Sequence, residues 1–283
     1  MAMAYASILD DRAVLALGGT DARDFLQGLV TNDLSACTEK CALYAALLTP
    51  QGKILFEFFI IPDGENRFLI DCAGVRAADL SKRLSMYKLR AKVGIAPQPQ
   101  LAVGAAWEKD GATPQMPAGA VSVADPRLPS LGLRVIAPRD VLARAFGGFS
   151  QGDYTEHRLS LGVPDSADLP PDSVFALDAG LEELNGVSFK KGCYVGQEVT
   201  ARMKHRATAR RRFVLVESAG ALPAAGTPVE SDGREIGTLA SGGTNRALAL
   251  IRLDHLAEAE AAQAEITAAG CKLVVHKADR LHA

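Results

Sequence analysis

The chain has 283 residues, of which 48% are hydrophobic, so it can bury a sizeable core divided over two or three domains. Its formal net charge of -2 at pH 7 favours no class of partner by itself. No uninterrupted apolar run approaches the roughly 18 residues that a membrane-spanning helix needs, so no membrane span is predicted.

Cysteine usage indicates a reducing compartment. The five cysteines are an odd number scattered over a long chain, which is typical of free thiols and not of a disulfide framework: Cys37, Cys41, Cys72, Cys193 and Cys271. Their spacing does not match the compact patterns of zinc or ferredoxin sites, so no stable metal is predicted. Asp10 and Asp11 lie where an arginine-rich, acid-poor transit peptide would have no acids. We therefore expect a cytoplasmic protein.

The first part of the chain reads as a strand-rich α+β unit. Thr20 can cap the first helix, and Pro50 and Gly52 suit the second and fourth positions of a type I turn in a hairpin. Hydrophobic periodicity predicts helices over residues 21–29 and 75–86 and strands over residues 12–17, 42–48, 53–61, 67–72, 92–96 and 101–106.

The second part ends in a different pattern. Residues 109–119 are rich in Gly, Pro and Ala and predict a link between units. A strand is predicted over 133–136 and helices over 139–146, 154–161 and 197–203. Short strands separated by Gly and Pro turns then favour a small β-barrel; they cover 213–217, 227–230, 235–240, 247–251 and 272–276. The whole chain is predicted to be α+β.

One stretch stands out as a site. It reads Lys191-Gly192-Cys193-Tyr194-Val195-Gly196-Gln197-Glu198. Glycines can adopt positive φ and allow close approach to the backbone, and Lys190 and Lys191 would favour the thiolate of Cys193 over the thiol. The thiol could be a nucleophile, a redox group, a ligand to an exposed cluster or a structural residue. We predict Cys193 and Lys191 as the catalytic candidates.

The octet resembles the signature of the YgfZ family of folate-binding, iron–sulfur cluster assembly proteins, which are related to the aminomethyltransferase of the glycine cleavage system. The resemblance covers most of residues 1–255 and includes the blocks at 25–33, 48–55, 86–93, 125–129 and 159–212. Residues 184–189 and 162–164 are more similar to the branch typified by the mitochondrial assembly factor.

The resemblance implies a three-domain, aminomethyltransferase-like ring whose central channel holds a folate, with a C-terminal β-barrel. The domains would comprise residues 1–45 with 112–205, an inserted domain at 46–111, and the barrel at 206–283. It also implies tetrahydrofolate or a related folate as cofactor. The partners would be iron–sulfur client enzymes or other cluster assembly proteins.

Candidate ligand-binding residues come from three places. Gln197 and Glu198 open a helix and could accept hydrogen bonds from a pterin, with Arg202 one turn farther on, although capping alone could explain the acid. Tyr87 lies beside bases at a helix end, which suits a flat anionic ligand or merely the helix dipole. The remaining candidates are Gly192 and Tyr194 in the octet, and Asn32 and Asp33, whose family counterparts lie near the folate channel.

A basic segment adjoins the octet. Residues 190–212 carry eight Lys or Arg and one acid, so this segment is a candidate docking surface for an anion or, as the alternative, a solvated strand edge. It has no aromatic residue for base stacking before Phe213, so nucleic-acid binding is not favoured, and an RNA-binding or tRNA-modification role is kept as the second alternative.

One departure from the family pattern concerns group transfer. Aminomethyltransferases have a pterin-binding glutamate in a Glu-Ala-Gly segment, and this chain has Ser160-Leu161-Gly162 there. A neutral serine cannot form the same charge-assisted pairing. We predict a folate-binding accessory factor for the assembly or repair of [4Fe–4S] proteins, with tetrahydrofolate-dependent one-carbon transfer as the first alternative.

Overall fold

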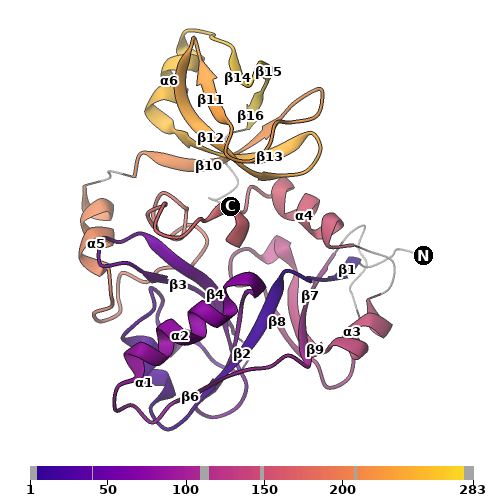
Figure 1. Cartoon of the computed structure of the whole chain (residues 1–283), viewed down its shortest axis with the longest axis vertical. Coiled ribbons are helices and arrows are strands. Elements are labelled where there is room, and N and C mark those ends of the chain that lie inside the picture. The colour runs from indigo at the N-terminus through magenta and orange to yellow at the C-terminus, as the bar shows by residue number, and fades with distance from the viewer. Residues whose placement is uncertain (1–4, 40, 109–114, 147–149, 207–208, 277–283) are drawn as a thin grey trace.

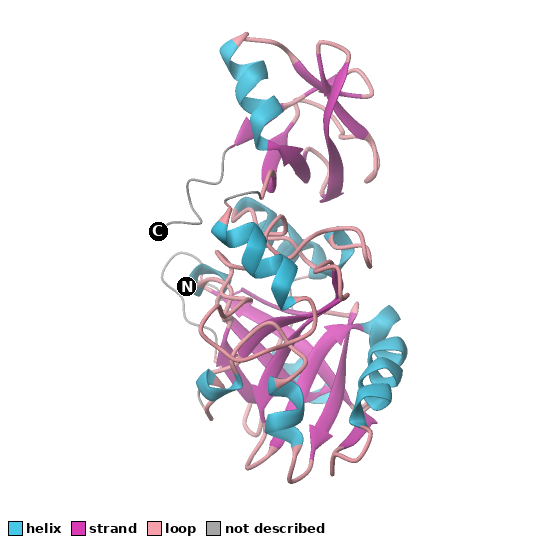
Figure 2. Ribbon diagram, turned by 90° about the vertical axis from the view of Figure 1, so that its left-hand side faces the viewer, coloured by secondary structure: helices cyan, strands magenta, loops and turns pink. Residues whose placement is uncertain are grey.

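A computed structural model describes residues 5–39, 41–108, 115–146, 150–206 and 209–276 (Figure 1). A larger body contains two antiparallel sheets, and a smaller C-terminal β domain is stacked on it along the long axis of the molecule (Figure 2). In the described part of the chain, no helix is long and apolar enough to cross a membrane.

The first sheet of the body has five strands in the order β3-β4-β5-β2-β6. Their bounds are Arg12–Gly18 for β2, Leu43–Leu48 for β3, Ile54–Pro62 for β4, Arg67–Ala73 for β5 and Gly94–Pro97 for β6. The predicted β3–β4 hairpin is confirmed, and Gly52 in its turn has φ +82°. Helices α1 (Ala22–Gln27) and α2 (Ala77–Lys88) bury Leu26, Leu80 and Leu84 in a core shared with this sheet.

The second sheet has four strands in the order β1-β7-β9-β8. They are Tyr5–Ile8, Leu101–Trp107, Leu133–Pro138 and Val121–Ala124, in that spatial order. Helices α3 (Arg139–Ala145) and α4 (Gln151–Ser160) follow β9. Helix α4 begins three residues before the predicted start, because Ser150 and Asp153 form a capping box.

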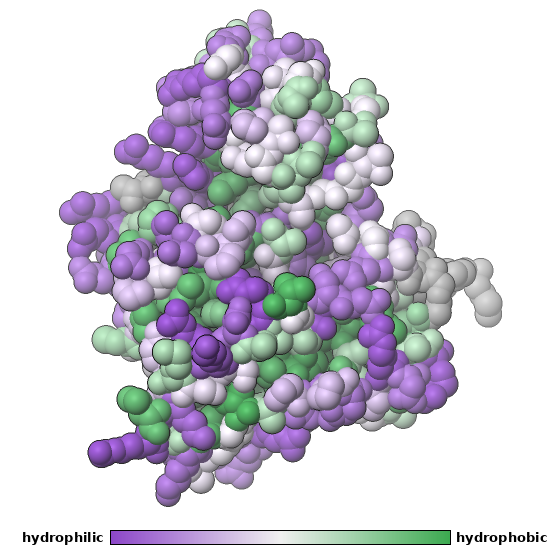
Figure 3. Space-filling view, in the orientation of Figure 1, coloured by the Kyte–Doolittle hydropathy of each residue, from purple (hydrophilic) through white to green (hydrophobic). Residues whose placement is uncertain are grey.

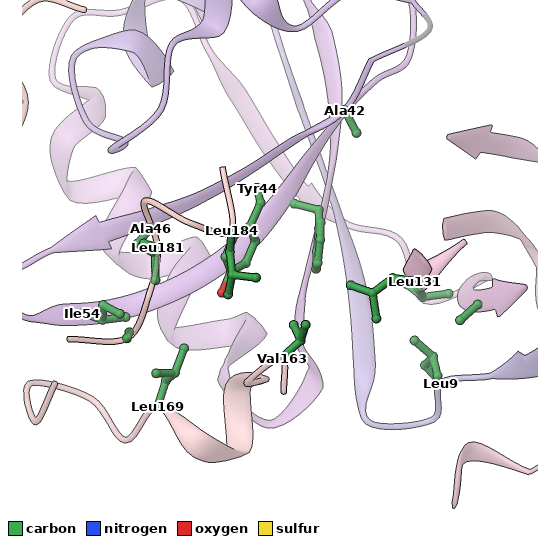
Figure 4. Close-up of a cluster of buried hydrophobic side chains, with 14 of the residues drawn as sticks. Leu9, Ala42, Tyr44, Ala46, Ile54, Leu131, Val163, Leu169, Leu181 and Leu184 are labelled. Carbon is green, nitrogen blue, oxygen red and sulfur yellow. The ribbon is translucent and has the colours of Figure 1, made fainter. Parts of the chain in front are cut away.

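The largest hydrophobic core joins the two sheets (Figure 4). Tyr44 and Ile54 from the first sheet share it with Leu131, which precedes β9, and with Val163, which follows α4. Leu181 and Leu184 reach it from the long irregular segment between α4 and α5 (Gln197–His205). This core fixes the segment that carries the candidate site.

The C-terminal domain is the predicted barrel-like β unit. Its seven-stranded sheet has the order β15-β14-β11-β12-β13-β10-β16 and includes the helix α6, Leu253–Ala261, between β13 and β14. The strands are β10 (Arg211–Glu217), β11 (Pro228–Ser231), β12 (Arg234–Gly242), β13 (Arg246–Arg252), β14 (Ile266–Ala268), β15 (Cys271–Lys272) and β16 (Val274–His276). Its own core is separate from the main core, apart from Phe213 and Leu248, which belong to the main core.

The sheets do not follow the predicted domain limits. The boundary at 45/46 passes through β3, and β7, assigned to the inserted domain, pairs with β1 and β9. Residues 109–114 of the predicted linker, and with them the 111/112 boundary, lie outside the described residues. The division into three domains stays a prediction.

Candidate functional site

The loop that carries Cys193 is held against the β3–β4 hairpin at Gly196. This glycine has φ +82° and precedes α5, and a Cβ on it would lie 2.6 Å from the carbonyl oxygen of Thr49. Gly52, across the contact, also has φ +82°, and its Cβ would lie 3.0 Å from that of Val199. The predicted need for glycine is therefore real at 196. Gly192 has an ordinary φ and open space around it.

Lys191 anchors the same loop to the end of α1. Its buried Nζ donates to the backbone carbonyl oxygens of Gln27 (2.6 Å), Val30 (2.5 Å) and Asn32 (2.9 Å). An ammonium has three donors, so these bonds use all of them. Burial lowers the pKa of Lys191 to about 8, against the opposing charge of Asp33. The geometry gives Lys191 a positioning role, and the predicted catalytic role has no support from it.

Cys193 is exposed and free, between the buried side chains of Lys191 and Tyr194. Burial raises the pKa of Tyr194 to about 12, so this phenol is a packed, neutral group. Of the other cysteines, Cys37 and Cys72 are buried and Cys41 is exposed. The loop therefore presents a thiol to solvent from a backbone that is fixed on both sides.

The helix α5 carries the predicted ligand residues on its surface. Glu198 accepts a hydrogen bond from Arg202 at 2.7 Å, and the two side chains are 84% and 56% exposed. Such an i,i+4 pair contributes only about 0.3–0.5 kcal/mol. The Gln197 side chain accepts a bond from the Tyr194 amide at 3.4 Å. These contacts account for the residues locally, and their predicted contact with a ligand stays a prediction.

The basic segment is partly neutralised by acids from a neighbouring turn. Lys204 pairs with Glu182, and Arg212 with Glu183 at 3.0 Å, in addition to the Arg202–Glu198 pair. The exposed bases without a carboxylate partner among the described residues are Lys190, Arg206, Arg210 and Arg211. The surface over α5 is correspondingly hydrophilic, at the left of Figure 3.

Asn32 and Asp33 are brought together with Lys191, as the sequence predicted for one site. The Asn32 amide donates to the carbonyl oxygens of Tyr44 (2.9 Å) and Asn185 (2.6 Å). Asp33 caps a short 3-10 turn, and the Ser35 amide and hydroxyl hold its pKa below the ordinary value. Tyr87 lies elsewhere, at the end of α2, half-buried against the core of that helix. These polar groups tie segments together and leave the ligand role a prediction.

Sequence reasoning missed a buried network of charges between the two sheets. Arg12 contacts Asp71 at 2.7 Å and Glu57 at 3.1 Å, both in the first sheet. Arg134 of the second sheet contacts Asp71 at 2.5 Å. The network continues through Asp125, Arg127, Arg158, Asp165 and Asp168. Its five carboxylates outnumber its four guanidinium groups.

A cavity of about 280 Å³ lies beside this network. Its polar wall includes Asp11, Glu57, Ser166 and Arg76, and its apolar wall includes Leu55, Phe56, Cys72, Ala73, Val75, Ala167, Leu169 and Pro171. Glu57 accepts bonds at Oε1 from Arg12 and Ser166, while its buried Oε2 has no hydrogen-bond partner among the described residues. Burial and the charge of Asp165 raise the pKa of Asp11. The cavity thus combines two carboxylates with apolar walls.

The sequence contains a signal for this network. Glu57 interrupts the apolar run of β4, and Asp71 and Arg134 interrupt β5 and β9 in the same way. A charged residue within a buried strand needs a partner, because burying an isolated charge is costly. Single charges in apolar strands could therefore have been read as a paired cluster, although their partners could not have been named.

Known proteins resemble both the fold and the sequence. A family model described as the CAF17 C-terminal beta-barrel domain matches residues 210–283. The solved aminomethyltransferase T of the glycine cleavage system from Bartonella henselae matches with a TM-score of 0.76, over 98% of this chain and 86% of that one, at 17% identity. At that identity the likeness shows the fold alone. The predicted α+β, aminomethyltransferase-like fold with a C-terminal barrel is confirmed.

The sequence relatives are more specific. The iron–sulfur cluster assembly factor IBA57 of Mus musculus is 34% identical over 88% of this chain and 77% of its own length. This chain belongs to the IBA57 family. The Homo sapiens IBA57 is also 34% identical, over 92% of the chain and 82% of its own length. IBA57 proteins fit the mitochondrial branch suggested by residues 184–189, whereas membership of the YgfZ family stays a prediction.

The IBA57 relatives also correct the predicted cytoplasmic location. They are named mitochondrial proteins, including those of Mus musculus, Homo sapiens and Neurospora crassa, so the cytoplasmic prediction is wrong. Its main argument was the presence of free thiols, which exclude oxidising compartments but do not distinguish one reducing compartment from another. The acids at Asp10 and Asp11 were the other argument, and they describe only the start of this sequence.

Proposed function

We propose that this IBA57-family chain supports the assembly or repair of [4Fe–4S] proteins and that Cys193 handles the iron–sulfur cargo. The observation that carries the proposal is the exposed thiol on a fixed loop. A thiolate is the usual protein ligand of iron–sulfur clusters, and a [4Fe–4S] cluster takes four of them. The loop supplies one ligand, so the remaining ligands come from a partner, either a client enzyme or another assembly protein.

The thiol role can be tested in cells that lack their own factor of this family, by measuring the activity of a [4Fe–4S] enzyme. The wild-type chain should restore that activity, and Cys193→Ala should not. Cys41→Ala is the matched control, because Cys41 is also an exposed free cysteine, and it should restore activity fully. Full restoration by Cys193→Ala would exclude the thiol role.

We further propose that the cavity beside Glu57 holds a tetrahydrofolate-type ligand. A reduced pterin presents an edge of N–H donors, which a carboxylate accepts in charge-assisted bonds. The cavity fits such a ring, since the buried Oε2 of Glu57 has no partner among the described residues and Phe56 and Leu169 supply an apolar wall. Glu57 and Asp11 would accept the ring's N–H groups.

This arrangement compensates for the residue that departs from the aminomethyltransferase pattern. Ser160 occupies the place of the pterin-binding glutamate, and its hydroxyl donates to the backbone carbonyl oxygen of His157 at 2.7 Å. Glu57 supplies a carboxylate from β4 instead. Retention of folate binding without that glutamate is therefore compatible with the residues around the cavity.

An anaerobic calorimetric titration with tetrahydrofolate tests the ligand. The wild-type protein should bind saturably, and Glu57→Gln should weaken binding about tenfold or more, because it replaces a charge-assisted bond by a neutral one. Glu198→Ala and Cys193→Ala should bind like the wild type. Loss of binding in Glu198→Ala, with Glu57→Gln unaffected, would instead place the ligand at α5. One-carbon transfer and RNA binding stay predictions from the sequence.

A further inference from the structure

The cavity beside Glu57 continues into a groove along α2. The groove has a volume of about 220 Å³ and shares Leu55, Phe56 and Arg76 with the cavity wall. Its other lining residues belong to α2: Asp79, Lys82, Arg83 and Met86. Strongly hydrophilic and strongly hydrophobic residues lie side by side over this helix (Figure 3). One continuous space therefore runs from the buried network to the molecular surface.

The two ends of this space have opposite charge. Glu57 and Asp11 line the cavity end, whereas three bases and one acid line the groove. The acid, Asp79, lies 3.7 Å from Nε of Arg76, and the two side chains are 71% and 28% exposed. Neither Lys82 nor Arg83 pairs with a carboxylate among the described residues. The groove has an excess of positive charge that its own residues leave uncompensated.

Arg76 stands where the two spaces meet. Its guanidinium carbon lies 4.5 Å from the centroid of the Phe56 ring, and both residues line the cavity and the groove. A guanidinium stacked on an aromatic ring is held in place and can still donate to a carboxylate or phosphate. A ligand that passes this point would meet a fixed cation, followed by Lys82 and Arg83 on successive residues of α2.

We propose that the groove binds the anionic tail of a γ-polyglutamylated folate, so that the protein prefers polyglutamylated over monoglutamylated tetrahydrofolate. The inference rests on the proposed folate ligand. The N–H donor ring matches the carboxylate end of the space, and each added glutamate contributes one carboxylate to the basic end. The aromatic linker between ring and tail matches Phe56 and Leu55 at the junction.

The test compares anaerobic titrations with tetrahydrofolate monoglutamate and pentaglutamate. For the wild type, the pentaglutamate should bind about tenfold more tightly at low salt, and the difference should shrink as salt rises. Lys82→Ala combined with Arg83→Ala should remove the preference and leave monoglutamate affinity unchanged. Arg139→Ala combined with Arg144→Ala on α3, whose residues do not line either space, should keep the preference. A thermal melt of each variant checks folding.

Equal affinity for the two ligands in the wild type, or an undiminished preference in the α2 variant, would overturn the tail site and leave the folate cavity standing. Absence of binding for both ligands would overturn the proposed folate ligand and the tail site together. The two failures are therefore distinguishable.

Discussion

At the scale of single residues, Gly196 explains why the thiol loop has its sequence. We expect Gly196→Ala to destabilise the protein by about 1–3 kcal/mol, because the residue has positive φ and its Cβ would meet the backbone of the hairpin. Gly192→Ala should change the free energy of unfolding by less than about 0.5 kcal/mol, since nothing lies near its Cβ. Urea unfolding measures both, and equal effects would refute the packing role of Gly196.

Lys191 and Lys190 form a second matched pair. Lys191→Met leaves three backbone carbonyl groups without their donor, and we expect a loss of about 1–3 kcal/mol in the free energy of unfolding. Lys190 is exposed, so Lys190→Met should be nearly neutral. If Lys191→Met kept wild-type stability but lost activity in cells, the lysine would be a catalytic residue and not an anchor.

At the scale of elements, the buried network makes the contact between the sheets depend on pH. Burial alone would raise the pKa of Asp125, but the Arg127 and Arg134 charges outweigh it and hold the pKa below the ordinary value. Asp165 behaves in the same way through Arg12 and Arg158. At low pH the unfolded chain then binds more protons than the folded one. The stability from these acids is present above about pH 4 and lost below it.

Urea unfolding at pH 7 and pH 3.5 tests this dependence. The wild type should lose stability steeply between the two values. Asp125→Asn should be less stable at pH 7 by about 3–5 kcal/mol, because it leaves buried Arg127 without its charged partner, and it should show a shallower pH dependence. An unchanged slope in Asp125→Asn would show that other acids control acid unfolding.

Element prediction succeeded where local patterns were strong. The apolar runs and the Pro-Gly turn of β3 and β4, and the spacing of Leu80 and Leu84 in α2, could be read directly. The strands β1 and β8 were missed because they are only four residues long and gain stability from pairing with distant partners. The charged cluster was missed for the same reason, since Arg12 and Asp71 meet only when the sheet forms.

At the scale of the whole molecule, β10 joins the C-terminal domain to the body. Phe213 faces the main core and its neighbour Val214 faces the core of the domain, as alternation along a strand requires. We expect Phe213→Ala to cost about 3–5 kcal/mol and to uncouple the domain from the body. Val214→Ala should instead weaken the domain itself.

Limited proteolysis with thermal unfolding distinguishes these two outcomes. Phe213→Ala should become sensitive to cleavage near β10 while a fragment containing the C-terminal domain persists. In Val214→Ala that fragment should be degraded first. Polar contacts of Ser241 with Asp168 (2.6 Å) and Arg158 (3.1 Å) reinforce the joint, so cleavage at the same rate in both variants would show that these bonds dominate.

Family and fold could be recognised from the sequence, yet the ligand position could not. The octet led to α5, where Glu198 and Arg202 are exposed, while the cavity lies among β4, β5 and the segment around Ser166. These elements are distant in sequence, and only the folded chain brings their side chains together.

Amide hydrogen exchange with and without tetrahydrofolate tests the central claim, that the ligand cavity and the thiol loop are separate sites. We predict slower exchange in β4, in β5 with the start of α2, and in residues 165–171, with no change in residues 189–198. Protection confined to residues 189–198 would contradict the account and place the ligand at the thiol.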